Sequence, residues 1–153
     1  MRNPSWFSHR YPTVDDLLVA IEGLGAVVLK APIGTGALFV AGEGHLPPAI
    51  ILPKKVGQLR LVWLMAHELG HLVLHGGYVS RWTHDRQEAA ADRWAARAMV
   101  PESAVRRHRN ASVDAFIGAL SSHYEDIPLY DCPERRLAAE IATIRLKAVE
   151  EVA

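Results

Sequence analysis

The sequence has one cysteine, Cys132, so no disulfide can form within a single chain. This suits a reducing compartment. It also lacks a charge excess, because 17 lysines and arginines balance 17 aspartates and glutamates. Proteins that bind nucleic acid usually carry a basic excess, so we expect no direct nucleic-acid binding. The short basic run at residues 106–109 is more typical of a solvated helix end than of a DNA-binding surface.

Long hydrophobic runs are missing too. The longest apolar stretch, Leu61 to Ala66, is far shorter than the roughly 20 residues needed to cross a bilayer. The first ten residues lack the apolar core of a signal peptide. We therefore expect a soluble, cytoplasmic protein with no membrane partner. With 153 residues, half of them hydrophobic, the chain can bury a core without disulfides or other crosslinks. We therefore predict a single domain over residues 1–153.

The expected elements follow the order helix, strands, helices. Thr13 and Asp16 resemble a capping box at the start of a helix, and Gly25 is placed where that helix would end. Short apolar runs between glycines and prolines predict strands at 26–29, 37–40 and 49–52. Apolar periodicity predicts further helices from about 58 to 75, 85 to 99, 113 to 124 and 133 to 152. This segregated order predicts an α+β fold rather than alternating α/β.

The run His67-Glu68-Leu69-Gly70-His71 lies inside a predicted helix that is apolar on nearly every face. Histidines at positions i and i+4 project from one side, about one turn apart, so their imidazoles can converge on one ion. Glu68 is rotated by about 100° around the axis, beside such an ion, where it could take a proton from a water. The alternative is a pair of ordinary core histidines with Glu68 in solvent. Because burying these groups unpaired is costly, we favour a metal site.

The third ligand of a catalytic zinc has two candidates. A histidine ten residues after the first is excluded, because that position is Gly77. His75 continues the i+4 series, but a straight helix carries it away from an ion held by the first two histidines. Glu88 follows on the next predicted helix among alanines, and Asp92 one turn later could accept an imidazole N–H. We favour Glu88, although it could instead be the capping-box partner of Asp85.

Two segments together resemble the ImmA/IrrE family of metallopeptidases. The first is residues 66–75, which match the family's H-E-x-G-H-x-x-x-H helix. The second is residues 88–101, where Ala91 to Ala95 and Met99 to Pro101 match a glutamate helix with a small-x-aromatic-Ala and Met-x-Pro signature. The run at 49–52 also matches the family's strand before the zinc helix. The resemblance covers roughly residues 14–105.

By position, the resemblance implies one Zn²⁺, or another divalent transition metal, bound by His67, His71 and Glu88. Glu68 would be the catalytic base. Glu88 and Asp92 would form the E-x-x-x-D pattern of thermolysin-like enzymes. Asp92 would contact a metal-binding histidine rather than the metal itself. Family members often have asparagine at that last position, but an aspartate can still orient a histidine.

The implied fold is a minimal zincin-like (gluzincin-type) domain, in which a small β-sheet packs on a helical HExxH core. This catalytic core would span about residues 14–105. A helical C-terminal region would cover about 106–153, although residues 121–132 match no pattern. The apolar spacing of the last predicted helix indicates a face packed on its own core, so it predicts nothing about the oligomeric state.

The resemblance further implies a zinc-dependent endopeptidase that cleaves a helix-turn-helix transcriptional repressor in a bacterial, phage or mobile-element switch. The alternative is a zinc-binding regulatory or sensor module that acts through protein–protein contacts without cleaving peptides. An exposed strand at 37–40 or 49–52 could hold an extended substrate. Four side chains are chemically able to donate to an oxyanion, although each is more typical of ordinary surface or packing: Tyr78, His84, His123 and Tyr124.

Overall fold

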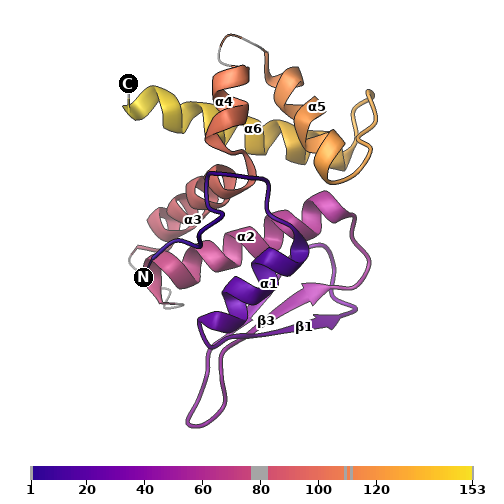
Figure 1. Ribbon diagram of the computed structural model, residues 1–153. Coiled ribbons are helices and arrows are strands. Elements are labelled where there is room, and N and C mark those ends of the chain that lie inside the picture. The colour runs from indigo at the N-terminus through magenta and orange to yellow at the C-terminus, as the bar shows by residue number, and fades with distance from the viewer. Residues whose placement is uncertain (1, 77–82, 109, 111, 153) are drawn as a thin grey trace.

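The computed structural model describes residues 2–76, 83–108, 110 and 112–152 (Figure 1). Within these ranges the chain forms six helices and one three-stranded mixed sheet. The helices are α1 (Val14–Gly23), α2 (Gln58–His75), α3 (His84–Met99), α4 (Glu102–Arg107), α5 (Val113–His123) and α6 (Pro133–Val152). The strands are β1 (Val27–Ala31), β2 (Leu38–Val40) and β3 (Ala49–Pro53). None of the helices in these ranges is long and apolar enough to cross a bilayer.

The α+β class is confirmed, and the predicted helices and strands agree with the observed ones to within two residues. The exception is α4, which was not predicted. It has only six residues, too few for an apolar period to stand out, and its last turn holds two arginines. The basic run at 106–109 therefore begins as the end of a short helix.

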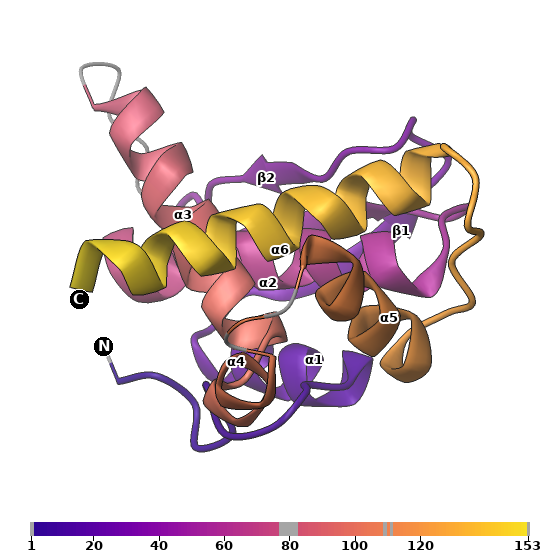
Figure 2. The ribbon, with the colours of Figure 1, turned by 90° about the horizontal axis from the view of Figure 1, so that it is seen from above.

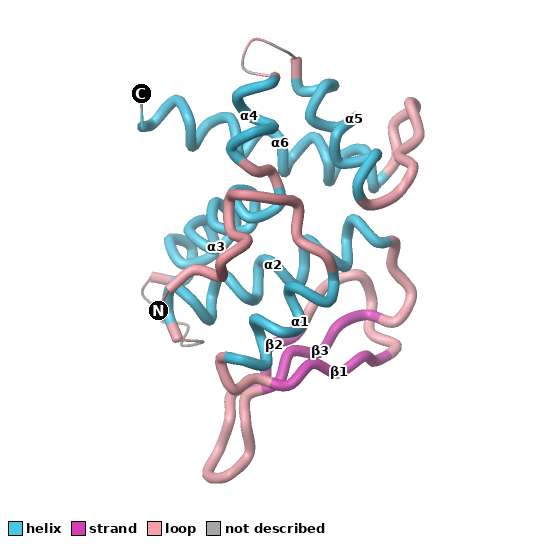
Figure 3. Tube along the Cα trace, in the orientation of Figure 1, coloured by secondary structure: helices cyan, strands magenta, loops and turns pink. Residues whose placement is uncertain are grey.

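The sheet has the order β1-β3-β2, as Figure 3 shows beneath the helices. β3 pairs in parallel with β1 and antiparallel with β2. Ile50 and Leu52 of β3 are buried, and helices α1 and α2 contact the sheet through β1 and β3 respectively. Since side chains alternate along a strand, the residues between them face the other way. That opposite face is open, and on it Leu29 of β1 and Leu38 of β2 are each 53% exposed.

The capping box at the start of α1 is confirmed. The Asp16 N–H donates to the Thr13 hydroxyl oxygen, and the Thr13 N–H donates to the Asp16 carboxylate. Leu17 and Ile21 on the next turns are fully buried, which fixes the face that α1 turns to α2. Gly25 follows the helix with φ +86°, a left-handed conformation that favours glycine.

Helix α2 runs through the middle of the molecule and contacts α1, α3, α6 and β3. Its contact with α3 is close, because Gly70 has no side chain to separate the two backbones. A Cβ at Gly70 would lie 3.2 Å from both the Ala91 carbonyl oxygen and the Trp94 ring. Ala91 and Ala95 of α3 are fully buried at this contact. The small residues on both helices thus let α3 approach α2.

Polar contacts attach the C-terminal region to the start of α2 and to the segment after α3. Glu125, in the segment after α5, accepts a hydrogen bond from the Leu59 N–H in the first turn of α2 at 2.8 Å. On α6, the buried Arg145 donates to the Val100 carbonyl at 2.9 Å and pairs with Glu102 at 3.2 Å. Figure 2 shows α6 passing across α2 and α3, in agreement with its contacts to both. The segment at 121–132, which matched no sequence pattern, therefore caps the central helix.

Candidate metal centre

The two histidines of the H-E-x-x-H run lie one turn apart on α2, as the i, i+4 spacing requires. The Nε2 atoms of His67 and His71 are 3.1 Å apart, and their ring centroids are 4.7 Å apart. Both side chains are mostly withdrawn from solvent, with exposures of 15% and 6%. Trp63, one turn earlier, packs beside the His67 ring with centroids 6.3 Å apart. Trp63 precedes His67 by four residues, a spacing that predicts the same helix face, but it was not predicted as part of the site.

Glu88 reaches both imidazoles from α3. One carboxylate oxygen lies 3.0 Å from the Nε2 of His67, and the other lies 3.0 Å from the Nε2 of His71. The ligand atoms of the three side chains all lie within 4.8 Å of one another. Two imidazole nitrogens and a carboxylate oxygen are a donor set that zinc and neighbouring divalent transition metals accept. The three residues thus fit a metal ion.

The alternative explanation for Glu88, a capping box with Asp85, is wrong. The residue that precedes α3 is Thr83 rather than Asp85, and the Thr83 side chain makes no capping hydrogen bond. Asp85 lies in the first turn and is exposed. The Glu88 carboxylate is instead directed to the imidazoles of α2.

Asp92, one turn after Glu88, lies behind His67. Its Oδ1 is 2.8 Å from the His67 Nδ1. Because a carboxylate only accepts, this contact places a ring proton on Nδ1, and Nε2 would then be the nitrogen that binds a metal. Burial lowers the pKa of His67, but the hydrogen bond and charge of Asp92, with the nearby carboxylates of Glu68 and Glu88, raise it overall.

Glu68 is partly buried next to these groups. Burial raises the pKa of its carboxyl, His67 opposes this, and the charge of Glu88 adds to the rise. A carboxyl with a raised pKa is better suited to exchanging protons near neutral pH. Burial and the neighbouring His67 lower the pKa of His71, which favours the neutral imidazole that a metal ligand needs.

His75 extends the histidine series by one more turn, with its ring centroid 5.7 Å from that of His71. Within the described ranges it is not part of the group that could hold an ion, whereas Glu88 is. The His75 Nε2 is buried and has no hydrogen-bond partner among the residues that the structure describes. The geometry therefore favours Glu88 over His75 as the third ligand.

The described candidate oxyanion donors lie in two places, His84 on α3 and the other two at the end of α5. Tyr78 lies outside the described residues. His84 is exposed at the first position of α3, one turn before Glu88. His123 stacks on Tyr11 with ring centroids 3.6 Å apart. The Tyr124 hydroxyl donates to the Pro12 carbonyl at 3.0 Å, and burial raises its pKa.

Of these four, His84 is thus the described residue that shares a helix with Glu88. The other two described candidates pack at the end of α5 against the segment before α1. Their contacts are those of ordinary packing residues.

Comparison with known proteins gives a family. The model of the IrrE N-terminal-like domain, Peptidase M78, matches residues 21–116. This range covers more than half of the chain and includes all of α2 and α3, with every residue of the site described above. Searches of curated proteins and of solved structures find no match. The chain belongs to the Peptidase M78 family, which supports a metallopeptidase-like function, a protein substrate and a bound metal.

Proposed function

We propose that this member of the Peptidase M78 family is a zinc-dependent endopeptidase that cleaves a helix-turn-helix repressor. The observation that carries the proposal is the convergence of Glu88 from α3 with His67 and His71 from α2. Glu68 is adjacent to His67 on the same helix, so a proton-accepting carboxylate lies next to the proposed ligands.

Each residue of the site would have a separate role in the reaction. His67, His71 and Glu88 would hold the ion, and Asp92 would favour an unprotonated His67 Nε2 by accepting a hydrogen bond from the Nδ1–H. When bound, zinc supplies Lewis acidity that polarises the substrate carbonyl and brings the pKa of a water to about 7. The Glu68 carboxylate accepts the proton of the attacking water and passes it to the leaving amine nitrogen.

An extended substrate fits the edge of the sheet. Of the two strands considered from the sequence, β3 is paired on both sides and has no free edge. Among the strands that the structure describes, β2 pairs with β3 alone, so its other edge can hydrogen-bond to a substrate chain. We infer that the repressor presents an extended segment to β2.

Co-expression with the repressor encoded beside its gene tests the function. We expect wild type to remove intact repressor and Glu68→Gln to leave it intact, while both proteins keep their metal. Glu22→Gln, on the exposed side of α1, is the matched control and should cleave like wild type. Full cleavage by Glu68→Gln would remove that residue from the mechanism. An intact repressor with wild type, together with an equal regulatory response from Glu68→Gln, would instead favour a zinc-binding sensor module.

A further inference from the structure

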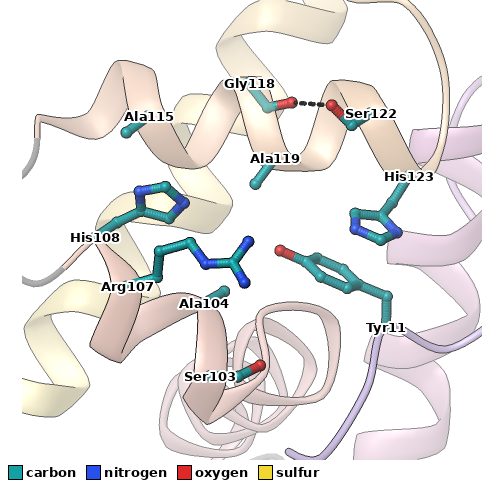
Figure 4. A pocket seen from close by; sticks show the side chains of 10 residues that line it. All are labelled: Tyr11, Ser103, Ala104, Arg107, His108, Ala115, Gly118, Ala119, Ser122 and His123. Carbon is teal, nitrogen blue, oxygen red and sulfur yellow. Dashed lines mark hydrogen bonds between the residues drawn. The ribbon is translucent and has the colours of Figure 1, made fainter.

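A cavity of about 660 Å³ lies between α4, α5 and the segment before α1 (Figure 4). None of the proposed metal-site residues lines it. Its volume falls within the range of about 300–1,000 Å³ that small-molecule sites occupy. The cavity is therefore large enough for a ligand of its own, separate from the metal centre.

Small residues make the hollow. Ala115, Gly118 and Ala119 of α5 face Ala104 of α4 across it (Figure 4). A Cβ added at Gly118 would meet no atom within 4 Å, so this glycine borders open space. Glycine inside a helix is less favourable than alanine by about 1 kcal/mol. No close packing contact at Gly118 offsets that cost, unlike at Gly70 of α2.

Hydrogen-bond donors converge on this space. The Arg107 guanidinium and the Tyr11 hydroxyl point toward one another, and His108 and His123 flank them (Figure 4). His123 stacks flat on Tyr11 and holds that ring in place. Burial raises the pKa of Tyr11, although Arg107 opposes the shift, so the hydroxyl stays a donor at neutral pH.

The charge of the cavity has one sign. Arg107 forms no ion pair with any acidic side chain that the structure describes, and none of the lining residues in the described ranges is aspartate or glutamate. By contrast, Arg145 of α6 is paired with Glu102. A guanidinium with a free fork matches a carboxylate or a phosphate, which accept two of its N–H groups at once.

We propose that this cavity binds a small molecule through an anionic group, a carboxylate or a phosphate, held by Arg107 and the Tyr11 hydroxyl. The rest of the ligand lies over the small residues of α5. Such a ligand touches α4, α5 and the segment before α1 at once. The proposal does not depend on the peptidase function.

Phenyl phosphate and benzoate are suitable probes, with benzamide as the neutral counterpart. Each is titrated into the protein of residues 1–153 in the presence of zinc and followed by amide chemical shifts. We expect at least one of the two anions to shift the signals of Gly118 and Ala119, and benzamide to leave them unchanged. Binding of benzoate would indicate that the cavity recognises a carboxylate, and binding of phenyl phosphate that it recognises a phosphate. Changes confined to residues around His67 and His71 would mean that the anion binds the metal, and the proposal would be wrong.

Matched variants separate a built site from general attraction. Arg107→Gln should weaken binding by about tenfold or more, or about 1.4 kcal/mol. Arg106→Gln removes the adjacent exposed charge, which does not line the cavity, and should change affinity by less than about twofold. Gly118→Leu fills the space and should abolish binding, whereas Gly118→Ala should retain it. Equal weakening by the two arginine variants, undiminished binding to Gly118→Leu, or no response to either anion would overturn the proposal.

Discussion

At the scale of single residues, the contact of Asp92 with the His67 Nδ1 leaves Nε2 as the nitrogen that would bind a metal. We expect Asp92→Ala to weaken zinc binding by about 10–100-fold, because the Nδ1 proton loses its acceptor. Asp92→Asn should fall in between, since its amide oxygen still accepts. Zinc competition with a chelator measures both, and Asp85→Ala on the exposed first turn of α3 is the control. Wild-type affinity in Asp92→Ala would show that His67 needs no such partner.

Asp16 is a residue whose contribution depends on pH. Its carboxylate accepts a hydrogen bond from Arg10 at 2.8 Å and another from the Thr13 N–H, and the Arg10 contact is the main cause of its lowered pKa. A carboxyl with a lowered folded pKa stabilises the fold above its unfolded pKa of about 3.9, and loses that effect as the pH falls.

We therefore expect Asp16→Asn to reduce the free energy of unfolding by about 0.5–1 kcal/mol at pH 7. The pair is partly solvated, which keeps the effect small. The difference from wild type should narrow below about pH 4. Urea denaturation across that range measures it. A difference that stays constant down to strongly acid pH would mean that the charge of Asp16 is not responsible.

At the scale of elements, the approach of α3 to α2 brings Glu88 to the histidines. Gly70→Leu should destabilise the protein by about 1–3 kcal/mol and weaken metal binding, because a side chain there meets Ala91 and Trp94. Gly118→Ala, in open space on α5, should be neutral or stabilising by up to about 1 kcal/mol. Thermal unfolding and zinc titration report the two effects. Unchanged metal affinity in Gly70→Leu would argue against a required close approach.

The sequence alone could predict the local part of the structure. The H-E-x-x-H spacing on a helix and the capping box at Thr13 depend on residues three or four apart, so both are visible in the chain. The approach of Glu88 to the histidines was predicted as well, because its helix has alanines on the contacting side. The oxyanion candidates were chosen for their chemistry alone, and His123 and Tyr124 pack elsewhere.

Other features depend on residues far apart in the chain and leave no local pattern. β3 lies between β1 and β2, so β1 pairs with a strand that does not follow it in the sequence. The contact between Glu125 and Leu59 spans 66 positions. Helix α4 is too short for its periodicity to stand out.

At the scale of the whole molecule, Glu125 ties the last third of the chain to the helix that carries the histidines. Its carboxylate lies at the N-terminus of α2, where Gly57 supplies no side-chain cap of its own. Loss of such a cap costs about 0.5–2 kcal/mol, so we expect Glu125→Ala to be destabilised by that amount. The adjacent exposed Asp126→Ala is the control, and chemical denaturation is the measurement. Equal stability of the two variants would mean that the contact contributes little.

The most direct test of the metal centre is the metal content of the purified chain, measured by mass spectrometry after dialysis against a weak chelator. We expect about one zinc per wild-type chain. His71→Ala and Glu88→Ala should lose it, whereas His75→Ala should retain it. Wild type without metal, or Glu88→Ala that keeps its zinc while His75→Ala loses it, would contradict the assignment of His67, His71 and Glu88 as the ligands.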